Sequence, residues 1–151
     1  MNWYIHLSRR PVTKVRDTIQ DDKSMHEGRA KPGGLWFTVG ENEDERWKNL
    51  RLSNGDSPEL FEYRTEIIIA ADAKILYVHS TSDLDAVTAK YGNHSESEID
   101  WPKIAREYDG IILAPYNSQW SNSARKKWYA SWDLASGCIW NKDAISKLVP
   151  R

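Results

Sequence analysis

The sequence predicts an α+β fold with a mixed, mostly antiparallel sheet and a few short helices, because strand and helix patterns follow one another without regular alternation. A chain of 151 residues is most simply one domain, long enough to bury about two-thirds of the surface it exposes when unfolded. Its 40% hydrophobic and 28% charged residues are typical of a folded globular protein. Residues 1–151 contain no repeat, linker or low-complexity stretch, which indicates a single domain.

Strands are predicted where apolar and β-branched residues alternate or run together. The predicted strands are residues 2–8, 34–39, 60–71, 73–80, 111–116 and 137–141, the last of these being the final strand. The isoleucine run at 67–69 makes the third strand the best candidate for a central position. Pro11 ends the first strand or confines it to an edge of the sheet.

Helices are predicted from helix-forming residues, capping residues and glycine stops. The predicted helices are residues 41–52, 81–92 and 100–110. Ser80, Thr81 or Ser82 caps the second helix, and Pro102 lies at a tolerated early position of the third. The remaining segments are a loop with or without a helical turn at 12–30, a loop or short helix at 121–135, and a short terminal helix or turn at 142–149.

Charge, cysteine content and hydropathy restrict the class of protein. The net charge of −1 gives no global basic field for nucleic acid or an acidic membrane, although a local strip such as Arg125-Lys126-Lys127 is hidden in that sum. The single cysteine, Cys138, forms no intramolecular disulfide, and a reducing cytoplasm is the expected compartment. No signal-peptide core and no apolar run of membrane-spanning length are present, so no membrane partner is expected.

Motifs for common cofactors are absent, and the aromatic content stands out. There is no phosphate-binding glycine loop, GxGxxG, GxSxG or HExxH, and the four scattered histidines share no ligand spacing, so no metal site is predicted. Eight Trp and seven Tyr stand against two Phe. Trp and Tyr combine a flat apolar face with a polar edge, which suits stacking on planar ligands; a tryptophan-rich core is the alternative.

The first predicted strand carries a candidate pair of ligand contacts. His6 and Ser8 share one face, because side chains two residues apart on a strand point the same way. Near the end of the strand they can present a donor and an acceptor to a ligand. The alternative is that His6 is a satisfied histidine at the sheet surface.

The stretch "KPGGLWFTVG", residues 31–40, carries a second candidate site. Its glycine pair, ending at Gly34, allows a positive φ and close approach of another backbone or a ligand. Trp36 and Thr38 then share a face of the strand. The stretch is either one wall of a ligand cleft or a hairpin entry with Trp36 in the core.

Three further positions have a functional and a structural interpretation. Asp133 lies just before the last predicted strand, where it is either a half-buried functional carboxylate or a capping or turn residue. Asp109 and Gly110 most simply end a helix and open a buried strand. Cys138 lies within an apolar strand with no base near it in sequence, which favours a buried inert thiol over a nucleophile.

The order of these features resembles the ADP-ribosyltransferase fold, in the branch that includes diphtheria toxin and the poly(ADP-ribose) polymerases. "YIHLS" is similar to that family's first strand, and "GGLWFTVGENEDERW" to its glycine, its aromatic strand that packs on nicotinamide and its following helix with another aromatic. "YRTEIIIAADAKILYVHSTSDLDAV" resembles the middle of that fold. "YDGIILAPY" resembles the motif that precedes its late strands, and "SGCIWNKDAI" resembles its closing strand, which runs into an asparagine or aspartate and a short turn.

This resemblance implies an NAD-dependent ADP-ribosyltransferase with a protein or nucleic-acid acceptor, and it implies roles for particular residues. The implied NAD-binding residues are His6, Ser8, Gly34, Trp36, Thr38 and Trp47, and the implied catalytic residues are His6, Trp36 and Asp133. His6 would bond a ribose, Gly34 would approach the carboxamide, and Trp36 would stack on nicotinamide. The chain departs from the family where its catalytic glutamate would stand, because Ser136 and Gly137 occupy that place and Asp133 is the nearest acid.

Two other functions stay open at this point. The missing glutamate is compatible with a module of the same fold that binds a nucleotide or a partner without catalysis. A small nucleic-acid-binding protein is the third possibility, in which basic residues contact phosphates while tryptophans stack on bases. Its basic residues would be Arg9, Arg10, Arg125, Lys126 and Lys127. The sequence does not fix the oligomeric state.

Overall fold

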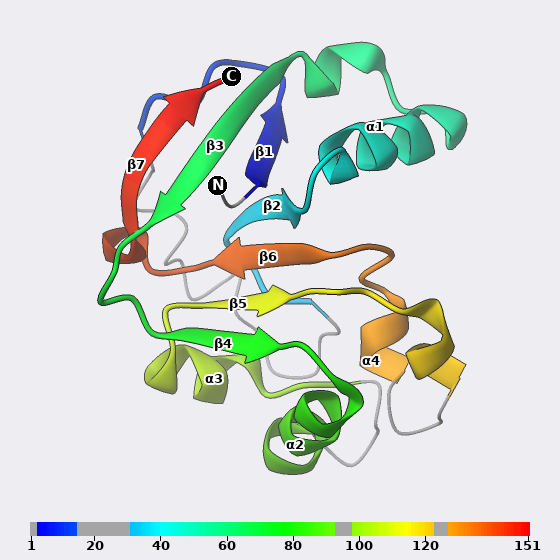
Figure 1. The fold of residues 1–151 in the computed structure, drawn as a ribbon, viewed down its shortest axis with the longest axis vertical. Helices are drawn as coiled ribbons and strands as arrows, with labels where there is room; N and C mark the ends of the chain where they lie inside the picture. The colour runs from blue at the N-terminus through cyan, green and yellow to red at the C-terminus, as the bar shows by residue number, and fades with distance from the viewer. Residues whose placement is uncertain (1–2, 15–30, 93–97, 123–126) are drawn as a thin grey trace.

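The computed structural model describes residues 3–14, 31–92, 98–122 and 127–151, which form an α+β unit (Figure 1). Its strands are β1 (Tyr4–Ser8), β2 (Leu35–Val39), β3 (Tyr63–Ile69), β4 (Ile75–Val78), β5 (Gly110–Leu113), β6 (Ser136–Ile139) and β7 (Ile145–Pro150). Its helices are α1 (Glu43–Ser53), α2 (Thr81–Tyr91), α3 (Trp101–Glu107) and α4 (Lys127–Ala130). Short 3-10 turns lie at Pro58–Phe61, Ser118–Asn122 and Lys142–Ala144.

All seven strands belong to one mixed sheet in the order β4-β5-β6-β2-β1-β3-β7. Only β4 and β5 run parallel, and the other neighbouring pairs are antiparallel. The sheet is strongly curled: β4, β5 and β6 run across the middle of the molecule, whereas β3 and β7 rise steeply above them (Figure 1). The predicted α+β class with a mostly antiparallel sheet is therefore confirmed.

The curled sheet has a hydrophobic cluster on each face. One cluster packs α2, α3 and α4 beneath β4, β5 and β6 and contains the buried side chains of Trp101, Trp128 and Trp132. The other lies on the opposite face and includes Phe37 and Ile112. Strand β5 is therefore buried on both faces, which explains its unbroken apolar sequence.

The helix signals in the sequence are confirmed in detail. The hydroxyl of Ser80 accepts a hydrogen bond from the Asp83 backbone N–H, so Ser80 is the cap of α2 among the three predicted candidates. The Asp100 carboxylate caps α3 in the same way, with Pro102 in its first turn. Gly92 follows the last residue of α2 as predicted.

Asp109 and Gly110 mark the start of the buried strand β5, as predicted. Asp109 also forms hydrogen bonds with the residue before β4 and with the residues after β6. Its carboxylate accepts hydrogen bonds from the Lys74 backbone N–H at 2.9 Å and from the Asn141 side-chain amide at 2.8 Å. Its backbone carbonyl accepts from Trp140 at 3.1 Å. Asp109 therefore aligns the start of β4 with the end of β6 on either side of β5.

The predicted terminal helix or turn at 142–149 is confirmed for its first three residues and wrong for the rest. A 3-10 turn occupies Lys142–Ala144, and residues 145–150 form β7, which pairs with β3 along its outer edge. The apolar residues Ile145, Leu148 and Val149 have helical spacing, but the unpaired edge of β3 offers backbone hydrogen bonds that favour an extended chain. Strand β6 is therefore not the last strand.

Two loop predictions fall partly outside the described residues. Residues 12–14 lie in neither helix nor strand, and the rest of the predicted 12–30 loop is not described. Within 121–135, residues 123–126 are not described and Lys127–Ala130 form α4. Among the described residues, no helix has the length and apolar character needed to cross a membrane.

Candidate functional site

The sheet opens between two of its central strands. Strands β1 and β2 pair at Tyr4 with Val39 and at Ile5 with Thr38. Beyond these pairs β1 continues alongside β3, whereas β2 continues alongside β6. The two strands diverge at this point, so the sheet is split along one side (Figure 1).

Side-chain hydrogen bonds join the two strands where backbone pairing stops. The Thr38 hydroxyl donates to the backbone carbonyl of Ile5 at 3.3 Å. Nδ1 of His6 lies 2.6 Å from the backbone carbonyl oxygen of Trp36. These contacts satisfy backbone acceptors that would otherwise face the gap, and they fix the side chain of His6 at its edge.

A cleft of about 320 Å³ lies at this gap, within the range of about 300–1,000 Å³ found for small-molecule sites. Its walls come from β1, β2 and the start of β6, and the Lys31-Pro32 pair ahead of β2 completes them. Four residues predicted to bind a ligand line this cleft: His6, Trp36, Thr38 and Trp47. They come from β1, β2 and α1, so the fold brings together residues separated by up to 41 positions in the sequence (47 minus 6).

The hydrogen bond of His6 determines which ring nitrogen carries its proton. A carbonyl oxygen only accepts, so Nδ1 must donate to Trp36 and Nε2 of the neutral ring is left as an acceptor. Burial lowers the pKa of His6, and the hydrogen bond to Trp36 offsets part of that effect. His6 therefore favours the neutral form, with one nitrogen able to accept a hydrogen bond from a ligand.

Two hydroxyl groups face each other across the floor of the cleft. Thr38 of β2 pairs in register with Ser136 of β6, and both residues are largely buried. The Ser136 hydroxyl donates to the Leu134 carbonyl at 3.1 Å, as that of Thr38 does to Ile5. Because both hydrogens are used within the protein, their oxygens contribute mainly acceptors to the cleft. Ser136 thus contributes a hydroxyl to the lining of the cleft.

The ring of Trp36 is held between an aromatic neighbour and a cation. The ring of Trp132 lies 5.0 Å from it, centroid to centroid, at an interplanar angle of 59°. Nζ of Lys31 lies 5.8 Å from the ring centroid. Trp132 is itself buried and lines the cleft, and its Nε1 has no hydrogen-bond partner among the described residues. A planar ligand that stacks on Trp36 must therefore displace Lys31.

Asp133, the predicted catalytic acid, is exposed and does not line the cleft. Its φ is 65°, and the Leu134 N–H donates to the Trp132 carbonyl at 2.7 Å, so Asp133 is the middle residue of a γ-turn. This turn directs its two neighbours, Trp132 and Leu134, to the cleft. Burial lowers the pKa of Lys31, and Asp133 is close enough for its carboxylate to oppose part of this effect.

Two other predicted contacts also lie outside the cleft lining. The Ser8 hydroxyl donates to the Arg10 carbonyl at 2.7 Å, which turns it toward its own loop. Gly34 has a φ of 149°, and a Cβ there would lie 2.5 Å from the Ile139 carbonyl oxygen. The close approach that this glycine permits is thus between β2 and β6.

Sequence reasoning missed Lys31, Trp132 and Ser136 as cleft residues. Lys31 stands directly before the Pro-Gly-Gly turn, and Trp132 stands directly before Asp133, so both were next to features already singled out. Nothing in their immediate sequence indicates that they meet. The tryptophan excess has two uses: Trp36 and Trp47 line the cleft, whereas most of the others pack in the core.

Neither Cys138 nor a cluster of metal-binding side chains forms a second candidate site among the described residues. Cys138 is fully buried and its burial raises the pKa of the thiol well above the usual value, which agrees with an inert residue. Among the described residues, no group of three or more His, Cys, Asp and Glu side chains is placed to hold a metal. Of the basic residues considered for nucleic acid, Arg9 and Arg10 are exposed at the end of β1, and Arg125 and Lys126 lie outside the described residues.

No family model matches the chain, and no curated protein or solved structure matches it significantly.

Proposed function

We propose that this chain is an NAD-dependent ADP-ribosyltransferase that binds NAD in the cleft between β1 and β2 and modifies a protein or nucleic-acid acceptor. The observation that carries the proposal is the convergence of His6, Trp36, Thr38 and Trp47 on one cleft. These residues belong to separate short motifs of the sequence, on β1, β2 and α1. Their meeting supports the resemblance to the ADP-ribosyltransferase fold.

The protonation state of His6 suits the recognition of a ribose. Its Nε2 accepts hydrogen bonds, and a ribose hydroxyl is a donor of the right kind. The neighbouring oxygens of Thr38 and Ser136 add acceptors suited to hydroxyl or carboxamide hydrogens. The cleft thus combines a flat apolar ring with several acceptors, a combination that fits the nicotinamide–ribose end of NAD.

In the proposed reaction the glycosidic bond between ribose C1′ and nicotinamide breaks, nicotinamide leaves with the bonding electrons, and an acceptor nucleophile bonds to C1′ and loses a proton. Trp36 orients the nicotinamide ring by stacking, and His6 holds the ribose. Stabilisation of the developing positive charge is the electrostatic contribution that matters most in such a reaction. Asp133 is the candidate for this stabilising role, because it is exposed and lies in sequence between two residues that line the cleft, Trp132 and Leu134.

A binding module without catalysis is the second candidate, and one observation favours it. None of the described residues that line the cleft is acidic, and Asp133 is exposed beside it. In this case NAD or a related nucleotide binds in the same cleft and the glycosidic bond stays intact.

Incubation with NAD labelled in its adenylate half and with cell lysate separates the two candidates. We expect label to become attached to macromolecules, and we expect His6→Ala to abolish the transfer because the ribose loses its anchor. His79→Ala is the matched control, since Nδ1 of His79 also lies near a backbone carbonyl, that of Ala114 at 2.8 Å, but His79 does not line the cleft. It should transfer label as the wild type does.

Other results of the labelled-NAD experiment decide between the transferase and the binding module. Tight binding of NAD without label transfer or nicotinamide release would leave the binding module as the function. No binding of NAD at all would exclude the transferase, and no binding of either NAD or ADP would exclude both candidates. Transfer lost in Asp133→Ala assigns the charge-stabilising role to Asp133, and unchanged transfer removes that role.

A further inference from the structure

Two of the three tryptophans that line the cleft, Trp36 and Trp47, carry a cation on the ring. Nζ of Lys31 lies 5.8 Å from the ring centroid of Trp36. The guanidinium carbon of Arg51 lies 5.5 Å from the ring centroid of Trp47. Cation–π contacts of this kind contribute about 0.5–1 kcal/mol each at exposed sites, so a ligand that offers a stronger partner can displace either cation from its ring.

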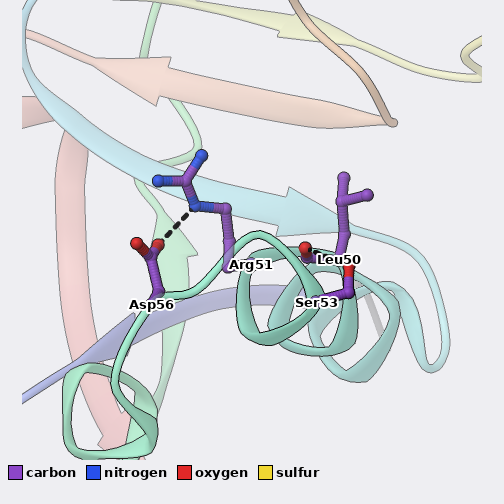
Figure 2. A network of polar contacts seen from close by, with 4 residues as sticks. All are labelled: Leu50, Arg51, Ser53 and Asp56. Atoms are coloured by element: carbon purple, nitrogen blue, oxygen red, sulfur yellow. Dashed lines mark hydrogen bonds and ion pairs between the residues drawn. The ribbon is translucent and has the colours of Figure 1, made fainter.

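Arg51 is positioned by a second contact that leaves part of its guanidinium available. Its Nε donates to a carboxylate oxygen of Asp56 at 2.6 Å, across the end of α1. Figure 2 shows Nε of Arg51 as the atom that contacts Asp56, with the two terminal nitrogens beyond it. The nearby contact between Ser53 and Leu50 closes the last turn of the helix that carries Arg51. The guanidinium of Arg51 is therefore held at the end of α1 through Nε, and its two terminal nitrogens take no part in that contact.

The two cations also affect one another. Burial lowers the pKa of Lys31; the carboxylate of Asp133 opposes this effect and the guanidinium of Arg51 adds to it. Arg51 thus lies near enough to repel Lys31, and none of the described residues that line the cleft is acidic. An anion placed between the two cations would remove this repulsion and provide charge-assisted hydrogen bonds to both.

We propose that Lys31 and Arg51 form a diphosphate-binding clamp at this cleft, so that a nucleoside diphosphate is held through its phosphates. On binding, a flat ring replaces Lys31 on Trp36 while Lys31 moves to the phosphates. The clamp rests on the proposed function for the identity of the nucleotide, because NAD carries both a flat ring and a diphosphate. The phosphate contacts themselves need only the two cations.

Calorimetric titration with ADP and with adenosine tests the clamp. We expect adenosine to bind at least about tenfold more weakly than ADP, because a hydrogen bond to a charged group contributes about 1.5–3 kcal/mol and 1.4 kcal/mol is about tenfold in Kd. Lys31→Gln and Arg51→Gln should each weaken ADP binding by about tenfold or more, and neither should weaken adenosine binding. Raising the salt concentration should weaken ADP binding more than adenosine binding.

Two control variants separate the effect of the Arg51 charge from a structural effect on α1. Asp56→Asn removes the ion pair of Arg51 but keeps the cation, so ADP should bind at least as tightly as to the wild type. Arg46→Gln removes an exposed cation from the same helix, paired there with Glu43 at 3.5 Å, and should have no effect. If Arg51→Gln does not fold, Lys31→Gln, in the segment before β2, still gives the answer.

Failure of the clamp is distinguishable from failure of the proposed function. Equal affinity for ADP and adenosine, or unchanged ADP affinity in both cation variants, overturns the clamp even if NAD is cleaved. Phosphate-dependent ADP binding that needs both cations upholds the clamp even if NAD does not bind. Absence of ADP binding overturns the clamp as well.

Discussion

Replacing Gly34 with alanine is expected to lower the free energy of unfolding by about 3 kcal/mol or more, because two separate costs add. The φ of 149° is a conformation that side-chain-bearing residues rarely adopt. The new Cβ would also lie 2.5 Å from the Ile139 carbonyl oxygen and 2.8 Å from the Cys138 sulfur. Since β6 is buried, β2 must move away to relieve this contact. Urea denaturation followed by tryptophan fluorescence measures the loss.

Gly55→Ala is the control for backbone strain alone. Gly55 has a φ of 96°, and no atom lies within 4 Å of where its Cβ would stand. We expect Gly55→Ala to cost about 1 kcal/mol, the lower end of the range for a residue held at positive φ. An equal loss at the two glycines would contradict the close packing of β2 on β6.

Trp36→Leu is expected to weaken NAD binding by about tenfold to a hundredfold. Stacking on an aromatic side chain contributes about 1–3 kcal/mol per base, and leucine keeps an apolar side chain but removes the ring. Trp36→Tyr keeps a ring at the position where the resembled family usually has tyrosine, so it should bind NAD within about threefold of the wild type if stacking decides the affinity. Calorimetric titration of variants with native circular dichroism provides the comparison. Equal losses in both variants would show that Trp36 acts through packing against Trp132.

The fold class was predictable because local signals determine most of its elements. The Ser80 cap, the early Pro102 and the isoleucine run of β3 each act within a few residues. Strand β7 was not predictable in this way, because it forms by pairing with β3 far along the chain. The Ser146 hydroxyl, for example, donates to the Ile68 carbonyl across 78 positions. Its own residues carry a helical spacing that the free edge of β3 overrides.

The candidate site was predictable in part for the same reason. Trp36 and Thr38 share one face of β2, as the alternation of side chains predicts. His6 follows Ile5, the register partner of Thr38, so alternation alone would place it on the other face, and it reaches the cleft because β1 and β2 separate at this point. The position of Asp133 depends on a γ-turn that an aspartate in a loop does not reveal. Lys31 and Arg51 come from a turn and a helix end, and only the packing of α1 beside β2 brings Arg51 close to Lys31, which lines the cleft.

Titration of NAD into ¹⁵N-labelled protein, followed through the indole N–H resonances of the eight tryptophans, tests the location of the binding site most directly. The resonances of Trp36 and Trp47 are predicted to shift, because these side chains line the cleft. Those of Trp128 and Trp140 should stay, since their Nε1 atoms donate to Thr88 at 2.9 Å and to the Tyr108 carbonyl at 2.7 Å, away from the cleft. No shift at saturating NAD, or shifts confined to Trp128 and Trp140, would contradict binding between β1 and β2.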